Sequence, residues 1–342
     1  VLQVQLLGEV PEAAETSSQA YALYLQGKHF MTQFDPAGTE ASAAAFRQAI
    51  EIDPEYAPAW ANLARIQRMR ANWGHIDLHA GTEEARRAAH RALELDDTLA
   101  DAWAILAHIQ WVYDWNWDQS EGTARTALMH GPNDARSLEI AARIANTLGR
   151  FDDGLKYARA AAEVDPLEPT VLRTLALTHW ARREYAEQQR VAERVRDLYP
   201  ERGTSWSNIA FALISQGLPE EALSMANNES SESMIMGVRA YAYHDLGRHE
   251  EARRALQYTI DNDADWLAYQ IAEAFAYRNE LDNAFQWLET AYGMRDGGIT
   301  YLVGDPTLEN LHGDPRWEAL LLKAGLLDAW HEAQRWYDGA GL

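Results

Sequence analysis

Residues 54–64 read PEYAPAWANLA, and related stretches recur as DTLADAWAILA at 97–107 and as PERGTSWSNIA at 200–210. In each copy a proline or an aspartate stands six residues before a tryptophan, and an aliphatic residue and an alanine follow. Prolines at 132, 166 and 200 are spaced by 34 residues. A fixed repeat of this kind predicts a fold in which similar units stack along the chain, each contacting its neighbours.

The period identifies the kind of repeat. A spacing of 34 residues is the length of a tetratricopeptide unit, which is a pair of antiparallel helices. Asp97 stands where a proline would fall, and its distance of 43 residues from Pro54 indicates an insertion of nine residues. We therefore predict an all-α protein, a right-handed superhelical α-solenoid of tetratricopeptide type with about eight helix pairs and C-terminal capping helices. The pairs are predicted to start near Tyr21, Tyr56, Ala100, Ala135, Pro169, Gly203, Ser233 and Asp265.

Side-chain sizes within the repeat favour the same fold. An aliphatic residue followed by a small one on a first helix, such as Leu63 and Ala64, lets two helices approach closely. The turns LGRFDD, QGLPEE and LGRHEE place a glycine after a first helix and acidic residues at the start of the next. The sixth pair is expected to be irregular, because ANNESSES is polar where its second helix should continue. Second-helix packing positions include Phe46, Ala49, Ala85, Ala89 and Ala92.

The composition excludes several classes of function. The chain has 342 residues, with 30 Lys and Arg against 52 Asp and Glu, and its formal net charge is -22. Such an acidic surface repels phosphate backbones and anionic lipid, so we predict no nucleic-acid contact by this region and no membrane insertion. The sequence contains no cysteine, which removes disulfides and thiolate chemistry. No apolar run reaches the roughly 18 residues that span a bilayer.

Five stretches together resemble one particular group of proteins. The combination is similar to the C-terminal tetratricopeptide region of bacterial multidomain signalling proteins. In that group the region follows a TolB-like segment, and an adenylate or guanylate cyclase, a winged-helix regulator or a Ser/Thr kinase stands upstream. The stretches are AYALYLQGKHF at 20–30, FRQAIEIDPEYAPAWANLA at 46–64, VYDWNWDQSE at 112–121, FDDGLKYARAAAEVDPLEPTV at 151–171 and DPTLENLHGDPRWEALLLKAGL at 305–326.

The resemblance implies a division of the chain. Residues 1–17, which begin VLQVQLLGEVPE, would be an N-terminal arm from the tail of the TolB-like segment. Residues 18–296 would form the solenoid and residues 297–342 a C-terminal capping segment, whose leucines are expected to cover the eighth pair. The chain contains no residues of a cyclase, kinase or winged helix, so any enzymatic activity would belong to an upstream domain.

The stretch DWNWD carries two tryptophans, Trp115 and Trp117, at the bend between the helices of the third pair. Such rings could form a stacking platform for a ligand or could fill the gap at the turn. Because they fall at the bend of a helix pair, we predict that they pack structurally.

First helices line the concave face of a solenoid of this type, so a ligand is expected to meet the same positions of each repeat. Arginines there suit capture of a carboxylate or phosphate, although solvated arginines paired with acidic residues would give the same pattern. The Lys/Asn pattern of a chaperone-type carboxylate clamp is not reproduced. The predicted concave-face binding residues are Arg65, Arg68, His108, Trp111, Arg136, Glu139, Arg143, Asn146, Arg173, Trp180, Phe211, Tyr241, His244, Tyr269 and Tyr277.

Other chemistry has little support. The insertion contains HIDLH, in which His75, Asp77 and His79 are residue types that bind metals, but no fourth ligand is in sight. We therefore predict no metal site and no cofactor. Catalytic motifs such as G-x-S-x-G or H-E-x-x-H are missing from the sequence, and its paired carboxylates fall at helix starts, where the helix dipole explains them.

Three functions remain open. The leading hypothesis is a non-catalytic scaffold and regulatory region that binds a protein or peptide segment in the concave groove through Arg136, Arg143 and Arg173. One alternative is a dimerisation module, a homo-oligomer formed through an exposed patch of Trp317, Trp330 and Trp336. Another is a small-molecule sensor with a closed pocket between Tyr241 and Tyr277. The compartment stays open, either the bacterial cytoplasm or the periplasmic side if an upstream membrane span exists.

Overall fold

The computed structural model describes residues 16–33, 35–200 and 205–342, and all regular structure in these ranges is helical. Most of the predicted N-terminal arm, 1–17, lies outside the described residues. The chain divides into two compact units. Unit 1 comprises Val1–Ile109 and Gly122–Pro132, and unit 2 comprises Gln110–Glu121 and Asn133–Leu342. The boundary between the two units falls inside the range predicted as one solenoid.

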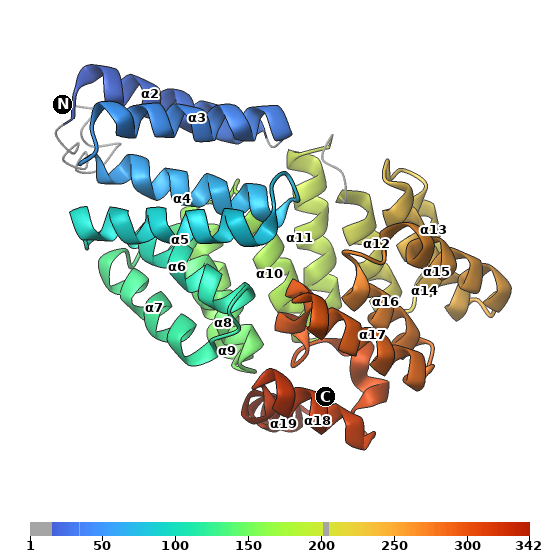
Figure 1. Cartoon of the computed structure of the whole chain (residues 1–342). Coiled ribbons are helices and arrows are strands. Elements are labelled where there is room, and N and C mark those ends of the chain that lie inside the picture. The colour runs from blue at the N-terminus through green and yellow to red at the C-terminus, as the bar shows by residue number, and fades with distance from the viewer. Residues whose placement is uncertain (1–15, 34, 201–204) are drawn as a thin grey trace. The chain divides into compact units, whose positions relative to one another are not determined.

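In unit 1, consecutive helices lie side by side as antiparallel pairs (Figure 1). The boundary between the units passes through both helices of the third pair, α6 and α7. The helices are α2 (Ser18–Phe30), the short 3-10 helix η1 (Met31–Gln33), α3 (Pro36–Ile52), α4 (Ala57–Asn72), α5 (Leu78–Leu95), α6 (Ala100–Val112) and α7 (Trp117–His130).

Unit 2 continues with five further pairs, which confirms the predicted α-solenoid of tetratricopeptide type. The second helix of the sixth pair, α13, ends at Ala226, the first residue of the polar ANNESSES stretch, as expected. The ten helices are α8 (Ala135–Thr147), α9 (Phe151–Val164), α10 (Pro169–Ala181), α11 (Tyr185–Leu198), α12 (Ser205–Ser215), α13 (Pro219–Ala226), α14 (Glu232–Asp245), α15 (His249–Asp263), α16 (Ala268–Tyr277) and α17 (Leu281–Met294).

The tryptophan that recurs in the repeats stabilises the start of a first helix. The indole N–H of Trp60 donates to the carbonyl of Pro54 at 3.0 Å, and that of Trp103 donates to the carbonyl of Asp97 at 2.8 Å. Each bond ties a first helix to the turn that precedes it. The aliphatic and alanine residues that follow are buried, with Ala64 and its counterparts fully so, which confirms the predicted close helix packing. The spacing of six residues places the tryptophan within reach of that backbone carbonyl in these two copies.

Left-handed residues end the first helices of unit 2. Gly149, Gly217 and Gly247 have φ values of 71°, 73° and 71°, which cost glycine little because it has no Cβ. In two repeats without a glycine, Arg183 and Asn279 adopt the same conformation, with φ values of 62° and 60°. The predicted turn after each first helix is therefore present whether or not glycine marks it.

The C-terminal segment does more than cover the eighth pair. It forms η2 (Gly297–Tyr301), η3 (Pro306–Leu311), α18 (Pro315–Ala324) and α19 (Leu327–Ala340). We call residues 297–311 the strap. η2 contacts α8 as well as α16 and α17, so the strap joins the first and the last pair of unit 2. Its apolar side chains are at most 2% exposed and belong to the core of this unit: Ile299, Leu302, Val303, Leu308 and Leu311.

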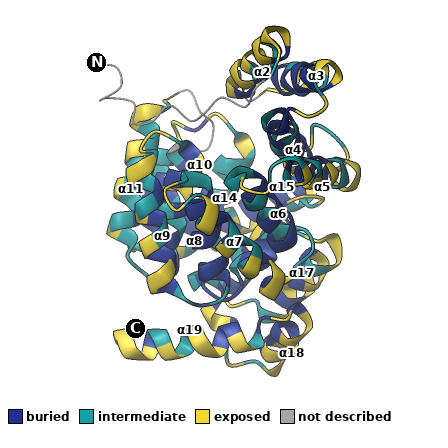
Figure 2. Cartoon of the chain, turned by 90° about the vertical axis from the view of Figure 1, so that its left-hand side faces the viewer, coloured by how far each residue is buried: buried dark blue, intermediate teal, exposed yellow. Residues whose placement is uncertain are grey.

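Helices α18 and α19 lie against the turns of several repeats of unit 2. α18 contacts α17, and its Leu320 and Leu321 are buried, as expected for a cap over the eighth pair, whereas Leu322 is exposed. α19 reaches further, because the hydroxyl of Tyr337 donates to the carbonyl of Ala181 at 2.7 Å and the ring of Trp336 packs 5.2 Å from that of Phe151. Buried and exposed residues alternate along α19 in Figure 2, as expected for a helix that packs on one face.

The two tryptophans of the DWNWD bend hold this cap, which confirms that they pack structurally. Trp117 is 8% exposed, and its indole N–H donates to the carbonyl of Ala324 at 2.8 Å. The ring of Trp115 lies 5.1 Å from that of Tyr292, and the guanidinium of Arg295 sits 4.8 Å from its centroid. The bend is therefore a docking point for α17 and α18.

Candidate functional site

The predicted binding residues of unit 1 lie on α4 and α6. Arg65, Arg68 and His108 are all half-buried. A guanidinium nitrogen of Arg68 lies 3.1 Å from Nε2 of His108. Two of the three side chains therefore meet, as residues on neighbouring first helices should, and both are engaged with each other.

On α8 of unit 2, the predicted arginine Arg143 is committed to a buried network. It forms an ion pair with Glu139, and its Nε also donates to Oγ1 of Thr174 at 3.0 Å. The Thr174 hydroxyl in turn donates to Glu139 at 2.7 Å. Burial by itself lowers the pKa of Arg143, but the nearby Glu139 carboxylate and Tyr301 hydroxyl raise it above its ordinary value overall. Arg143 therefore stays charged and is satisfied inside the protein.

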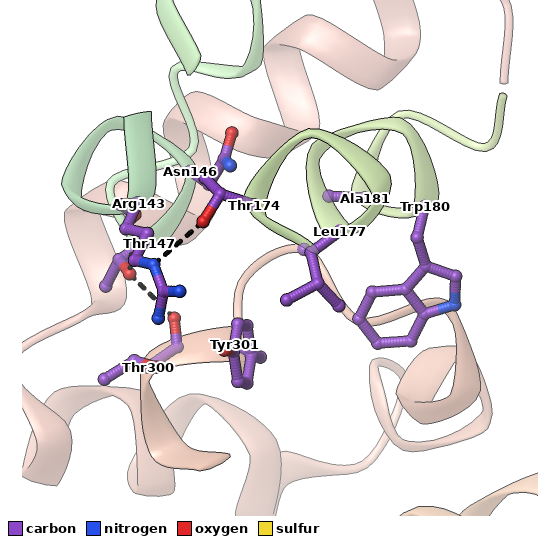
Figure 3. Close-up of a pocket in the computed structure, with 10 residues that line it drawn as sticks. Arg143, Asn146, Thr147, Thr174, Leu177, Trp180, Ala181, Thr300 and Tyr301 are labelled. Atoms are coloured by element: carbon purple, nitrogen blue, oxygen red, sulfur yellow. Dashed lines mark hydrogen bonds between the residues drawn. The ribbon is translucent and has the colours of Figure 1, made fainter. Parts of the chain in front are cut away.

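The strap closes the same region (Figure 3). The indole of Trp111 donates to Oγ1 of Thr147 at 2.8 Å, and that hydroxyl donates to the carbonyl of Thr300 at 2.8 Å. Leu177, Trp180 and Tyr301 border the small pocket that remains, whose enclosed volume is about 20 Å³. That volume holds about one water molecule, whereas metabolite pockets measure roughly 300–1,000 Å³.

Helix α10 presents a different surface. Arg173 is exposed and, among the residues that the structure describes, has no ion pair. Leu177 and Trp180 follow at i+4 and i+7, on the same face, and both are half-buried. Figure 3 shows these two side chains directed toward Tyr301 of the strap. Arg136, at the start of α8, is also half-buried. α10 therefore offers an exposed cation next to partly exposed apolar surface.

The later first helices of unit 2 carry a row of aromatic rings. The centroid of Phe211 lies 5.7 Å from that of Tyr241, which lies 4.9 Å from that of Tyr277. The hydroxyl of Tyr277 donates to Asp245 at 2.9 Å. The half-buried His244 has a pKa below its ordinary value, chiefly because burial disfavours the charged ring. These rings therefore pack on one another across α12, α14 and α16.

Two carboxyl groups, that of the buried Asp305 in the strap and that of the half-buried Glu273 on α16, meet where the strap packs on this helix. Asp305 is 1% exposed and accepts a hydrogen bond from the hydroxyl of Tyr269 at 2.8 Å. Glu273 lies one turn after Tyr269 and hydrogen-bonds the same Asp305 carboxyl group. Burial raises the pKa of Glu273 well above its ordinary value, and the negative charge of Asp305 raises it further. Glu273 therefore keeps its proton to higher pH than an ordinary glutamate.

Several predicted site residues are buried in the core, and their contact with a ligand stays a prediction. Trp111 is 2%, Glu139 8%, Tyr241 7% and Tyr269 0% exposed. Each has the expected position on a first helix, but side chains of neighbouring helices or the strap cover it.

The aromatic patch predicted for self-association is also not exposed. Trp317 is 0% and Trp330 6% exposed, and their rings pack edge to face at 5.6 Å. Trp336 is half-buried, with the guanidinium of Arg182 4.8 Å from its centroid. These rings pack within one chain, so the expectation that they form an exposed patch is wrong.

The HIDLH segment has structural contacts. Nδ1 of His75 lies 3.1 Å from the hydroxyl of Thr39, and Asp77 caps α5 by accepting from the backbone N–H of Ala80 at 2.8 Å. Within the described ranges, no cluster of three or more metal-binding side chains is found. No described helix is both long enough and apolar enough to cross a bilayer.

Sequence reasoning missed the threonines that lie beside Arg143 and Asn146. Thr147, Thr174 and Thr178 link neighbouring helices, and the amide of Asn146 donates to Oγ1 of Thr178 at 2.7 Å. Threonines one turn apart on a first helix, at 174 and 178, are the only signal that could have pointed to them.

No family model matches the chain, and no curated protein is similar enough to be identified as a relative. Solved structures match at low identity. The human IFIT1 dimer with PPP-AAAA aligns with a TM-score of 0.54 and 14% identity, over 86% of this chain and 76% of that one. A tetratricopeptide repeat protein from Parabacteroides merdae aligns with a TM-score of 0.44 and 12% identity, over 90% and 100%. Yeast Tom70 aligns at 0.49 and 14%, over 92% and 67%. At these identities the similarity concerns the fold.

Proposed function

We propose that this chain is a non-catalytic protein-interaction scaffold that binds an acidic, partly apolar peptide segment along the inner face of α10. The observation that carries the proposal is the line of Arg173, Leu177 and Trp180, which combines an exposed, unpaired guanidinium with partly exposed apolar side chains. The buried arginine of α8 cannot take this part, because Glu139 and Thr174 already satisfy it.

The charge of the chain makes Arg173 informative. In a protein of net charge -22, most cations should find an acidic neighbour, and many arginines of unit 2 do. A planar guanidinium left without an ion pair can bind a carboxylate through two parallel hydrogen bonds. Leu177 and Trp180 would then bury apolar side chains of the same segment, which supplies the larger part of the affinity.

The proposal is tested by selection from a phage-displayed library of random peptides on the immobilised chain. We expect the selected peptides to combine a carboxylate with a large apolar residue. Arg173→Glu should weaken a selected peptide by about tenfold or more, which is about 1.4 kcal/mol. Arg159→Glu, the same charge change at an exposed position of α9, should leave its affinity unchanged. Selection of no peptide, or equal losses in both variants, would remove the proposal.

We further propose that the scaffold regulates an output domain encoded upstream in the same gene. The resemblance of the DWNWD bend and of residues 305–326 to bacterial signalling proteins supports this. The gene itself provides the test. A cyclase, kinase or winged-helix domain in frame before the codon for Val1 is the expected finding, and its absence there contradicts this part of the proposal.

A further inference from the structure

The small pocket of Figure 3 borders the proposed peptide site on α10. Its apolar lining comes from Leu177, Trp180 and Ala181 of α10 and from Tyr301 and Gly304 of the strap. The leucine and the two rings are half-buried and form its mouth, whereas Ala181 and Gly304 are buried and form its floor. We call these five residues the strap pocket.

The chemistry of the strap pocket favours an apolar occupant. Most of the surface that it exposes belongs to carbon atoms. Arg143 also lines it, but the charge of this arginine is already paired with Glu139. An apolar group that enters the pocket therefore removes carbon surface from water without separating a charge from its partner.

The strap sets the size of the pocket. A Cβ on Gly304 would lie 3.0 Å from the Cβ of Ala181, so the strap already packs closely on α10. Hydrogen bonds hold it on both sides of Tyr301, one at the carbonyl of Thr300 and one at the carboxyl group of Asp305. The enclosed volume of about 20 Å³ has room for about one methyl group, as it has for one water molecule. An aromatic ring is too large to enter.

The pocket lies one to two helical turns from Arg173. Along α10 the rise from Arg173 is about 6 Å to Leu177 and about 10 Å to Trp180, and the three residues share one face. An extended peptide advances about 3.3–3.6 Å per residue. A carboxylate at Arg173 and a side chain in the pocket are therefore two or three residues apart in one segment.

We infer that the strap pocket receives the terminal methyl group of one aliphatic side chain, leucine or methionine, of a peptide segment whose carboxylate pairs with Arg173. This inference rests on the proposed function and adds to it a choice between aliphatic and aromatic side chains. Leucine can insert a methyl group and cover the partly exposed surfaces of Leu177 and Trp180 with the remainder of its side chain. Phenylalanine cannot, because Tyr301 and Gly304 narrow the pocket.

The first experiment varies the peptide and leaves the chain unaltered. A peptide selected on this chain is synthesised with leucine, methionine, alanine or phenylalanine at its apolar position, and the four affinities are measured by calorimetry. The leucine and methionine forms should bind within about threefold of each other. The alanine and phenylalanine forms should be weaker by about tenfold or more. Equal binding of the leucine and phenylalanine forms would overturn the inference, as would selection of peptides with an aromatic residue at this position.

The second experiment changes the wall of the pocket. Tyr301→Ala enlarges it and should bring the phenylalanine form to within about threefold of the leucine form. Tyr301→Phe, the matched control, keeps the ring and should keep the preference. Circular dichroism and thermal unfolding establish that both variants are folded before binding is compared. An unchanged preference in Tyr301→Ala would show that the strap does not select the side chain.

A third measurement needs no substitution. The leucine methyl groups of the bound peptide, labelled with ¹³C, should shift upfield because the rings of Trp180 and Tyr301 stand at the mouth of the pocket. Methyl signals that stay at their free positions in the bound peptide contradict the insertion.

The outcomes separate the two proposals. If Arg173→Glu weakens a selected peptide, but its leucine and phenylalanine forms bind equally well, the strap pocket is overturned while the peptide site on α10 stands. If the unaltered chain selects no peptide, both proposals fail together.

Discussion

The inner faces of α8 and α10 make an instructive comparison, because both are first helices of adjacent repeats and both carry an arginine predicted to meet a ligand. The side chain of Arg143 on α8 is 11% exposed and bonded to Glu139 and Thr174. Arg173 on α10 is exposed and has no ion pair among the described residues. The place within the repeat fixes which way a side chain faces. Arg143 is the ninth residue of its repeat and Arg173 the fifth, so what each meets depends on its place along the helix as well as on whether the strap covers that stretch.

The largest expected loss of stability comes from breaking the buried network on α8. Glu139→Ala leaves the Arg143 charge buried without its partner, and should lower the free energy of unfolding by about 3–5 kcal/mol. Arg173→Ala should change it by less than about 0.5 kcal/mol, because that side chain is exposed. Urea unfolding followed by circular dichroism measures both. Equal effects of the two substitutions would mean that the two helices do not differ as described.

The carboxyl groups of Asp305 and Glu273 predict the next largest effect, a dependence of the free energy of unfolding on pH. A folded-state pKa of Glu273 above its unfolded value means that the folded chain holds the proton longer. The contribution of Glu273 to the free energy of unfolding is fully present below the ordinary glutamate pKa of about 4.3. It is lost as the pH rises toward the raised pKa of the folded state. The slope from one proton is at most about 1.4 kcal/mol per pH unit.

The matched control for this pH dependence is Glu273→Gln, which keeps a hydrogen-bond donor for Asp305 and cannot ionise. Urea midpoints of the two proteins between pH 5 and pH 8 should diverge, with the unaltered chain losing stability relative to the variant as pH rises. Parallel curves would show that Glu273 is not protonated in the folded chain beyond the ordinary range.

A smaller effect concerns the hydroxyl that anchors the strap. Tyr269→Phe removes the donor to Asp305 and should cost about 1–2 kcal/mol, because a buried acceptor loses one partner. Tyr277→Phe, which removes a more exposed hydrogen bond to Asp245, should cost less. Urea unfolding compares the two variants. If the order of the two losses is reversed, Asp305 is not the anchor that the geometry indicates.

The smallest expected effect on stability concerns Gly237, a glycine inside α14. Gly237→Ala should raise the free energy of unfolding by about 0.5–1 kcal/mol, since the glycine has an ordinary helical conformation and the added methyl group has room. Thermal unfolding measures it. A destabilising result would mean that the fold does require glycine at this position.

The repeats could be predicted from the sequence because their determinants are local. Leu63 and Ala64, the turn glycines and the short second helix that ends at ANNESSES all act within one repeat, so a 34-residue period reveals them. The structural role of Trp115 and Trp117 followed from their position at a bend. Their partners Tyr292 and Ala324 could not be found in this way, because nothing in the period relates them to the bend.

The strap accounts for most of what was missed at the site. Thr147 and Thr300, which it joins, are 153 residues apart, and residues 297–311 follow no helical period that would mark them as core. Tyr269 was correctly placed on a first helix, but its burial depends on Asp305 and on Gly298, where a Cβ would lie 2.2 Å from its ring. Contacts of this kind are set by tertiary packing of single residues, which a repeat pattern does not encode.

The most direct test of the difference between the two helices is hydrogen–deuterium exchange of the chain with and without a selected peptide. We expect slower exchange in α10, with no change in α8 or in residues 297–311. Faster exchange in residues 297–311 would mean that the peptide displaces the strap, and protection confined to other helices would mean that the open inner face is not where a partner binds.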